Sequence, residues 1–442
     1  MAAPVLSAET DLAARAFADL RRRASGEPAW LSSLRDRAFA RFQELGFPGP
    51  ADESWKHTNV APIARIAWES VAHDPDAGRP LPVPEAAGAP GIQLGFLNGR
   101  WSRALSGPAA HAAQAAGLDV LPLANVIRDH PDRLQPHFGR HAGWENSAFT
   151  AWNTALAEDG AFVRVSREAA AAGPIHLLFL SEGTGAPTVA HPRNLIVVEK
   201  GAQATVVETY LGHGRTLTNS VTEIALEDGA SLDHAKVQRE ASDAFHVHSI
   251  AATLGRSARF TSSSVAFGGS IARTDLGVLF TGEGGDCTLN GLFVGDGTAL
   301  LDTHTTVDHA TPHCTSRQLY KGILDGHSRG VFHGTVLVRK DAQKTDALQS
   351  NKNLLLSRDA LVHSTPALEI FADDVKCKHG STIGQLDAGA LFYLRSRGIG
   401  EQEARALLTW AFASDVVGRF KPQVVREETE LALATRLPGP PR

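Results

Sequence analysis

The chain has 442 residues, of which 43% are apolar and 21% are charged, and its formal net charge is −5 with histidine neutral. This composition supports a large buried core and excludes global disorder, and the weak negative charge argues against nucleic acid or an anionic membrane as the main partner. Three cysteines without a CxxC pair suit a reducing compartment, so we expect a cytoplasmic protein. No secretory signal and no apolar run of about 18 residues is visible.

The N-terminal part is predicted to be helical. Apolar residues recur at helical spacing over residues 7–23 and again over residues 28–45, where glycine and proline then end the pattern. Residues 74–91 are rich in proline, glycine and alanine, which predicts a linker. A mixed segment follows, with helix-like stretches at 109–140 and 144–158.

From about Pro174 the pattern changes to short apolar or alternating runs separated by glycine and aspartate, which predicts β-strands. A similar turn recurs at Gly201, Gly229, Gly255 and Gly285, at spacings of 28, 26 and 30 residues. A loose repeat of this length, with two or three strands per unit, is typical of stacked solenoid coils. The residues therefore favour a β-helix, and a β-sandwich of hairpins is the alternative.

The C-terminal part is predicted to be helical again. Asp387 is expected to cap a short helix, and further helices are predicted from about Gly400 and over residues 422–437. The middle helix carries an apolar stripe of Ala404, Leu407, Leu408, Ala411, Phe412 and Val416. Such helices either cap the open end of a solenoid or form a docking surface.

The predicted architecture is therefore mainly β, with helical regions on both sides of a β-helix. We expect an N-terminal helical or mixed domain over residues 1–158, a β-helix core over 159–380 and a C-terminal helical domain over 381–442. The nucleotide-phosphate motif GxxxxGK[ST] is missing from the sequence, and no HExxH, GxSxG or GxGxxG occurs in strand–helix context. Any energy-driven step would therefore need a nucleotide-hydrolysing partner.

Cys377 and His379 are the most suggestive candidates for metal ligands. They stand two residues apart in ADDVKCKHG, so on a strand they share one face. Thiolate and imidazole suit iron–sulfur clusters, zinc and Cu(I). Two ligands leave a metal half-coordinated, so a second subunit would have to complete the site. A buried thiol beside an exposed histidine is the ordinary structural alternative.

Three further groups could carry chemistry, each with a structural alternative. His304, His309, His313 and Cys314 lie within eleven residues, but histidines scattered over a solenoid are commonly solvated. The Asp373–Asp374 pair suits a corner or salt bridge better than acid–base catalysis, because adjacent strand residues point to opposite faces. The Trp55-Lys56-His57 segment could stack a ligand or anchor an irregular segment to the core.

Several segments together resemble the SufB/SufD family of iron–sulfur cluster assembly proteins. The longest is PALEIFADDVKCKHGSTIGQLDAGALFYLRSRGIGEQEARALLTWAFA (366–413), and the others are ESWKHTNVAPI (53–63), CTSRQLYKGIL (314–324), GVFHGTVLV (330–338) and QKTDALQSNKNLLLS (343–357). The WKHT segment and the chain length resemble the SufD branch more than the SufB branch. Firm similarity covers about half of the chain, and the order and spacing of the motifs fit the rest.

The resemblance implies a right-handed parallel β-helix flanked by helices, in a scaffold subunit that is not itself an enzyme. It implies pairing with SufB through the end of the β-helix and docking of the ATPase SufC on the C-terminal helices. A homodimer is possible for the isolated chain, because the same β-helix edge can pair with itself. The docking face would be Leu407, Leu408, Ala411 and Phe412, or the neighbouring exposed residues of 383–418. His379 matches the family's candidate cluster-site histidine, with Cys377 beside it, and Cys314 and His313 are weaker candidates.

The cargo implied by the resemblance is a transient iron–sulfur cluster, or iron, held at the SufB interface. No tightly bound cofactor is expected in the isolated chain. Two alternatives remain open at this point. One is a purely structural partner of SufB, in which Cys377 and His379 only pack at the interface. The other is a carbohydrate-active β-helix enzyme, which would need a carboxylate cluster on one long face and usually secretion, neither of which is evident.

Overall fold

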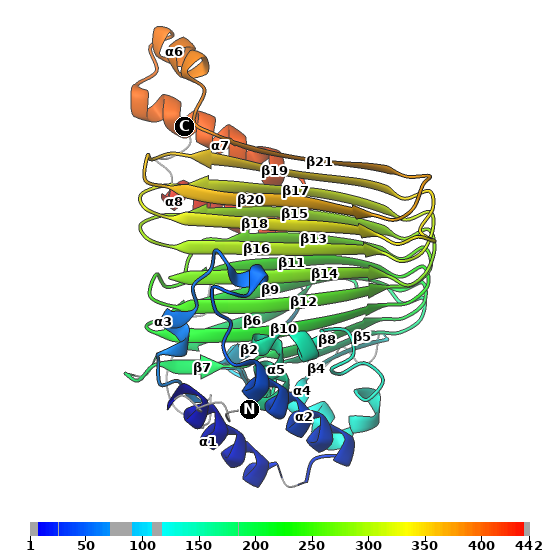
Figure 1. Ribbon diagram of the computed structural model, residues 1–442. Coiled ribbons are helices and arrows are strands. Elements are labelled where there is room, and N and C mark those ends of the chain that lie inside the picture. Colours follow the sequence, from blue (N-terminus) through cyan, green and yellow to red (C-terminus); the bar gives the residue numbers. More distant parts are fainter. Residues whose placement is uncertain (1–7, 25, 71–90, 108–116, 184, 437–442) are drawn as a thin grey trace.

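The computed structural model describes residues 8–24, 26–70, 91–107, 117–183 and 185–436. Its main feature is a parallel β-solenoid of about eight turns, in which successive strands alternate between two facing sheets (Figure 1). Sheet A contains β8 (Arg193–Val198), β10 (Thr216–Leu226), β12 (Phe245–Leu254), β14 (Ile271–Phe280), β16 (Leu300–His309), β18 (Arg329–Val338) and β20 (Leu361–Ile370). Sheet B contains β6 (Ile175–Glu182), β9 (Gln203–His213), β11 (Ser231–Glu240), β13 (Arg259–Ala266), β15 (Asp286–Gly295), β17 (Thr315–Leu324), β19 (Asp346–Leu355) and β21 (Lys376–Gly384).

The predicted β-helix is confirmed, and the β-sandwich alternative is wrong because these strands pair in parallel. The N-terminal end is closed by shorter strands, some of which pair antiparallel. These are β1 (Glu69–Ser70), β2 (Ile92–Leu97), β3 (Arg100–Ser102), β4 (Leu118–Pro122), β5 (Ala161–Val165) and β7 (Thr188–Ala190).

One corner of six successive coils places a residue in the left-handed backbone region. The positions are Gly201, Gly229, Ser257, Gly284, His313 and Lys344, with φ between 54° and 72°. Each is joined to the next coil by a backbone bond, such as Gly229 N–H to the Arg256 carbonyl at 2.8 Å. The sequence repeat is therefore real. Its left-handed residue is Ser257 in the third unit and Gly284 in the fourth, rather than the glycines at 255 and 285.

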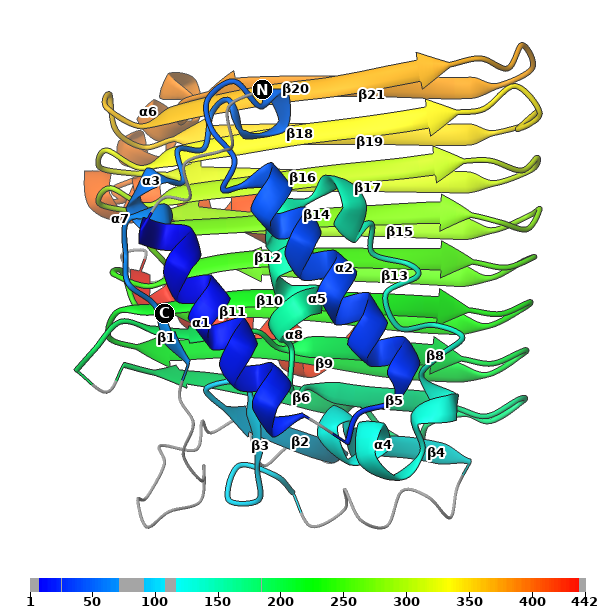
Figure 2. The ribbon, with the colours of Figure 1, turned by 60° about the horizontal axis from the view of Figure 1, so that its bottom comes forward.

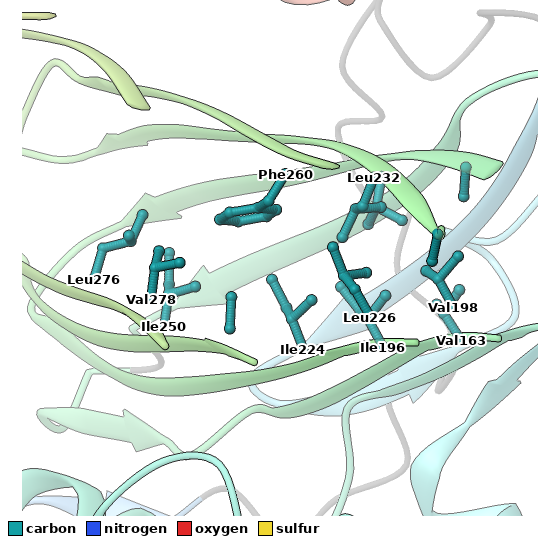
Figure 3. Close-up of a cluster of buried hydrophobic side chains, with 14 of the residues drawn as sticks. Val163, Ile196, Val198, Ile224, Leu226, Leu232, Ile250, Phe260, Leu276 and Val278 are labelled. Carbon is teal, nitrogen blue, oxygen red and sulfur yellow. The ribbon is translucent and has the colours of Figure 1, made fainter. Parts of the chain in front are cut away.

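Half of the interior between the two sheets is apolar. Inward-pointing residues of successive coils form continuous columns, such as Val163, Ile196 and Ile224 in sheet A, and all three are 0% exposed (Figure 3). Burial of each such side chain stabilises the fold by about 1.5–3 kcal/mol. A single coil could not exclude water from these side chains, so the columns require stacking.

The N-terminal helices cover the outer face of sheet A (Figure 2). Here α1 (Ala8–Arg23), α2 (Ala29–Leu45) and α5 (Ala148–Leu156) confirm the predicted helices, and α3 (Ala61–Ala64) and α4 (Leu123–Asp129) are short. The predicted helix at 109–140 is wrong over β4, and its first part, like most of the predicted linker, lies outside the described residues. Three single-turn helices complete this layer, η1 (Glu53–Trp55), η5 (Pro131–Arg133) and η6 (Trp144–Asn146).

A fully buried ion pair ties this layer to the solenoid. The Arg193 guanidinium lies 2.6 Å from the Glu223 carboxylate, and neither side chain is exposed. Glu223 also accepts hydrogen bonds from the backbone N–H groups of Gly139, His141 and Ala142, at 2.8–3.0 Å. Burial would raise the pKa of Glu223, but Arg193 and these donors hold it below its ordinary value. The carboxylate thus stays charged and fixes the N-terminal layer against sheet A.

The C-terminal helices are α6 (Ala388–Ser396), α7 (Glu401–Val417) and α8 (Gln423–Arg436). Asp387 caps α6 as predicted, since its carboxylate accepts the Ala390 N–H at 2.6 Å. Helices α7 and α8 pack on the outer face of sheet B, where Val416 and Val425 join a cluster with Val237. They cover the flank of the solenoid and not its end, so the alternative of an end cap is wrong (Figure 1).

Candidate functional site at the open end of the solenoid

The last coil of the solenoid has strand neighbours on one side only. Strands β20 and β21 pair with β18 and β19, and they are the terminal strands of their sheets. Large apolar side chains are exposed on or beside these two strands: Leu361 (49%), Ile370 (40%), Phe371 (64%) and Ile383 (52%). A long apolar edge with free backbone N–H and C=O groups is a template for pairing with another chain.

Cys377 and His379 both lie on β21, within this edge. Their register partners on β19 are Ala347 and Gln349, whose side chains are buried between the sheets. Strand alternation therefore places Cys377 and His379 on the inner face, side by side at the open end. This confirms the prediction that they share a face. Cys377 is half-buried and packs against a small apolar cluster that includes Val338, while His379 is exposed.

The Cys377 thiol is protonated in this environment. Burial raises the pKa of Cys377, and a hydrogen bond with the Ala347 backbone only partly opposes this effect. Metal binding must therefore displace a proton from the thiol. Within the described part of the chain, no group of three or more His, Cys, Asp or Glu side chains is arranged to hold a metal ion. Cys377 and His379 are thus at most part of a ligand set.

The weaker candidates are not brought together. Cys314 is fully buried, and its Sγ lies 3.6 Å from the Gly282 carbonyl oxygen. His313 is exposed at a corner, while His309 is buried between the sheets, 2.9 Å from the Ser316 hydroxyl. His304 lies on the outer face of sheet A, where its ring stacks on His333 at 5.1 Å. These four residues do not form one site.

The two remaining sequence candidates have structural roles. Trp55 is covered by the Arg273 guanidinium at 3.7 Å on one side and contacts the Phe149 ring at 5.2 Å, so it anchors its segment to the core. A cleft of about 520 Å³ beside it, on the outer face of sheet A, lies away from Cys377 and His379. Asp374 pairs with Lys344 at a corner, as the salt-bridge interpretation predicted.

The four residues predicted as a docking face differ in exposure. Ala411 is exposed, whereas Leu407 and Leu408 are half-buried. Phe412 packs against sheet B: Lys321 Nζ lies 4.3 Å above its ring and donates to its carbonyl oxygen at 2.7 Å. The most exposed aromatic side chains nearby are Phe392 (74%) and Tyr393 (60%) on α6. Sequence reasoning included them only within the exposed residues of 383–418 and did not single them out, although α6 lacks an apolar stripe that would bury its aromatic residues.

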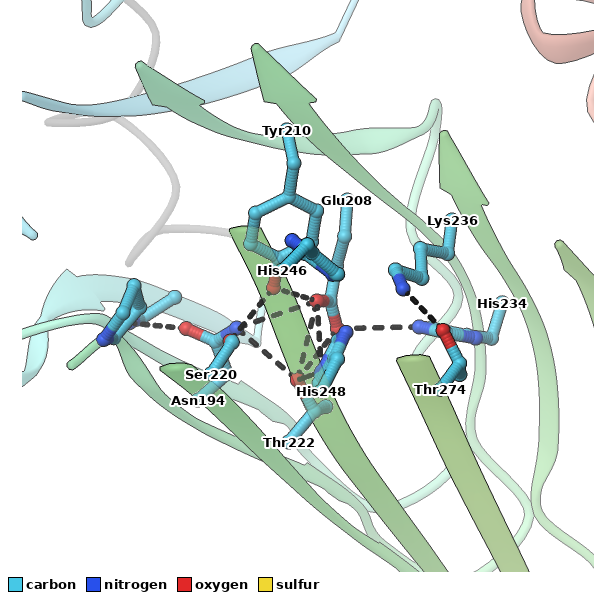
Figure 4. Close-up of polar contacts among 12 residues, drawn as sticks. Asn194, Glu208, Tyr210, Ser220, Thr222, His234, Lys236, His246, His248 and Thr274 are labelled. Atoms are coloured by element: carbon cyan, nitrogen blue, oxygen red, sulfur yellow. Dashed lines mark hydrogen bonds and ion pairs between the residues drawn. The ribbon is translucent and has the colours of Figure 1, made fainter. Parts of the chain in front are cut away.

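The other half of the solenoid interior is polar, which sequence reasoning also missed (Figure 4). At its centre, Glu208 accepts hydrogen bonds from the Tyr210 hydroxyl at 2.6 Å and the Thr222 hydroxyl at 2.9 Å, and it lies 3.1 Å from His234 Nε2. Burial would raise the pKa of Glu208, but the His234 hydrogen bond and these hydroxyl groups lower it. Burial lowers the pKa of the neighbouring Lys236 to about 8. Polar residues at alternate positions of apolar strands were the available signal.

Comparison with known proteins gives the context of this edge. The family model described as "SUF system FeS cluster assembly, SufBD core domain" matches residues 179–412, and "SufBD protein N-terminal region" matches residues 94–177. A SufBD family iron–sulfur cluster assembly protein of Synechocystis is 33% identical, over 89% of this chain and 88% of that protein. The iron–sulfur cluster assembly protein SufD of Escherichia coli is 31% identical, over 89% and 90% respectively. SufD of Bacillus subtilis is 24% identical, over 91% and 93%.

The fold and its edge define a parallel β-solenoid scaffold with one end closed and the other open. The chain belongs to the SufBD family of iron–sulfur cluster assembly proteins, and its similarity to proteins named SufD extends over most of its length. The matching family consists of iron–sulfur cluster assembly proteins, so the comparisons do not support the alternative of a carbohydrate-active β-helix enzyme. None of the described helices has the length and apolar character needed to cross a membrane.

Thiol labelling distinguishes the three cysteines. We expect iodoacetamide to modify Cys377 alone in the native chain, because Cys287 and Cys314 are 0% exposed. The labelling rate should continue to increase above pH 8.5, the ordinary pKa of a thiol being about 8.5, because the pKa of Cys377 is raised. Mass spectrometry of the labelled chain measures both effects, with Cys377→Ser as the control. Labelling of Cys314 at a comparable rate would contradict this account.

The buried histidines predict a loss of stability in mild acid. Burial lowers the pKa of His191 to about 3 and that of His309 to about 4. At pH values between the ordinary histidine pKa of about 6.5 and the lower pKa in the folded state, the unfolded chain binds more protons than the folded chain. The free energy of unfolding therefore falls as pH falls through this range. From pH 7 to pH 5 each residue should contribute a loss of about 2 kcal/mol.

Urea unfolding at the two pH values tests this prediction. His309→Gln should reduce the pH dependence by about 2 kcal/mol, and His313→Gln, at an exposed corner, is the comparison variant. An identical pH dependence in the wild type and His309→Gln would show that His309 does not stay neutral in the folded state.

Proposed function

We propose that this chain is a non-ATPase scaffold subunit of a Suf iron–sulfur cluster assembly system. It pairs with a SufB-type protein through β20 and β21, and it docks a SufC-type ATPase through its C-terminal helices. Cys377 and His379 supply part of the ligand set for a nascent cluster, or for incoming iron, at the joint between the two solenoids. The observation that carries the proposal is this incomplete ligand pair on the inner face of an open edge.

The edge suits a partner of the same architecture. Two neighbouring strands end the two sheets together, so a second solenoid end can extend both sheets at once. Main-chain hydrogen bonds would supply affinity, and the exposed Leu361, Phe371 and Ile383 would be buried at the joint. Because Cys377 and His379 face inward, they would lie between the sheets of the combined solenoid. A transferred cluster held there is shielded from water until the joint moves.

The chemistry of the pair suits a cargo that is passed on. A thiolate binds iron strongly, but the Cys377 thiol must first lose its proton. Imidazole is a weaker ligand than thiolate and competes with protons. A mixed pair completed by ligands from another chain therefore holds a cluster only while both chains are in place. Separation of the chains leaves each with an incomplete set and favours release.

The ATPase would act through the link between α7 and sheet B. Lys321 on β17 lies 2.7 Å from the Asp415 carboxylate on α7, besides its contacts with Phe412. Strand β17 is two strands below β21 in the same sheet. A pull on α6 and α7 when two ATPase subunits close would thus reach the sheet that carries Cys377 and His379.

Exposed aromatic residues of α6 give a test of docking. Phe392→Asp combined with Tyr393→Asp should reduce co-purification of the SufC-type ATPase at least tenfold, because exposed aromatic side chains commonly dominate docking energies. Leu431→Asp is the matched control, since Leu431 is 60% exposed on α8. Equal ATPase recovery from the double variant and the control would exclude α6 as the docking site.

The ligand role is tested with His379→Ala in the complex with the SufB-type and SufC-type partners. We expect the complex to assemble with normal stoichiometry by size exclusion and to build little cluster on anaerobic reconstitution with iron and sulfide. Visible absorption and iron content measure the yield. His313→Ala, at an exposed corner, is the control. Full cluster yield from His379→Ala would favour a purely structural partner role instead.

A further inference from the structure

Three side chains form one inner column that ends at His379. Gln318 on β17 is the register partner of Gln349 on β19, and Gln349 is the register partner of His379 on β21. Partners on neighbouring strands lie about 4.8 Å apart and point the same way. Gln318 is 3% exposed and Gln349 is 1% exposed. Two buried amides therefore stand directly beneath the candidate ligand.

Hydrogen bonds from below orient these amides. The Thr305 hydroxyl donates to Gln318 Oε1 at 2.9 Å, and Gln349 Nε2 donates to the same oxygen at 3.5 Å. Gln349 Nε2 therefore donates toward β17, which pairs with the edge of β19 opposite to β21. Its carbonyl oxygen Oε1 is left without a partner, although it is buried. A buried acceptor without a hydrogen-bond partner is destabilising, and packing alone does not explain why one is present here.

Strand β18 of sheet A carries Gly334, which leaves space for the Gln349 amide between the sheets. A Cβ atom at Gly334 would lie 2.3 Å from Gln349 Nε2 and 2.8 Å from its Cδ. Any side chain at position 334 would therefore displace the Gln349 amide. In contrast, Asn351, the next inward residue on β19, is already satisfied, because its Oδ1 accepts from the Ser364 hydroxyl at 2.7 Å.

We propose that Gln349 is a positioning residue for His379, an inference that rests on the proposed function. Gln349 Oε1 accepts a hydrogen bond from the Nδ1–H of His379 and thereby fixes both the tautomer and the ring orientation. Nε2 then keeps its lone pair and points out of the open end toward the incoming iron. Histidine ligands commonly donate their second N–H to such a partner, and the nitrogen that binds the metal is set by that bond.

Nitrogen NMR of the full chain, purified without partners or iron, tests the tautomer directly. With ¹⁵N-histidine, the His379 signals are assigned by their loss in His379→Gln. A free neutral imidazole prefers the Nε2–H tautomer, so a predominant Nδ1–H tautomer is expected in the wild type. Gln349→Met, which cannot accept a hydrogen bond, should restore Nε2–H. Gln349→Glu should keep Nδ1–H, and Ser350→Ala, on the outer face of the same strand, should change nothing.

Gly334→Ala provides a second variant that leaves the glutamine chemically intact. Displacement of the amide should shift His379 toward the Nε2–H tautomer, as in Gln349→Met, and this keeps the test available if Gln349→Met folds poorly. Urea midpoints monitor folding of each variant. The inference is overturned if the folded variants all show the wild-type tautomer, or if the wild type itself shows Nε2–H.

Cluster assembly separates this inference from the proposed function. In the complex with both partners, Gln349→Met should weaken cluster binding about 10- to 100-fold, and Gln349→Glu should restore it. If His379→Ala builds clusters at full yield, the proposed function fails, and the tautomer result then stands only for the isolated chain. If His379→Ala abolishes the cluster but Gln349→Met has no effect on tautomer or yield, the positioning role alone is excluded.

Discussion

In-register stacking of parallel coils is the constraint on which the rest of this structure depends. Each inward residue lies directly above its equivalent in the coil below, so side chains of one kind form columns that run along the solenoid. Several columns are apolar and form the main core cluster. Other inward positions are polar, and there Glu208 is hydrogen-bonded to Tyr210 and Thr222. At the corners, the same stacking repeats a left-handed residue and its backbone bond in coil after coil.

The same constraint makes the last coil different from all the others. Every inner coil is satisfied by neighbours on both sides, whereas β20 and β21 keep one free edge and expose apolar residues such as Phe371. A helix pair that could have covered this edge packs on the flank of sheet B instead. The open end therefore combines an unsatisfied backbone, apolar surface and the two candidate ligands Cys377 and His379, which is the arrangement that the proposed shared site requires.

Buried polar side chains inside the solenoid also reach the open end. Charges such as Glu208 are tolerated inside because hydrogen bonds from neighbouring coils offset the cost of burial. Farther along the solenoid other inward positions carry amides, and one of them, Gln349, lies in the coil beneath His379. Residues from coils distant in sequence thus approach the candidate ligand from the inside, while the proposed partner chain would meet it from the outside.

The sequence by itself determined the β-helix, its repeat, the flanking helices, the family, and the shared face of Cys377 and His379. These depend on local patterns, namely strand alternation, helical spacing and recurring turns. Only the tertiary structure decided that Gln318, Gln349 and His379 form one column, because they are 31 and 30 residues apart and the coils vary in length. It also placed Phe412 against Lys321 rather than in solvent, since the face that a helix buries depends on the surface it meets.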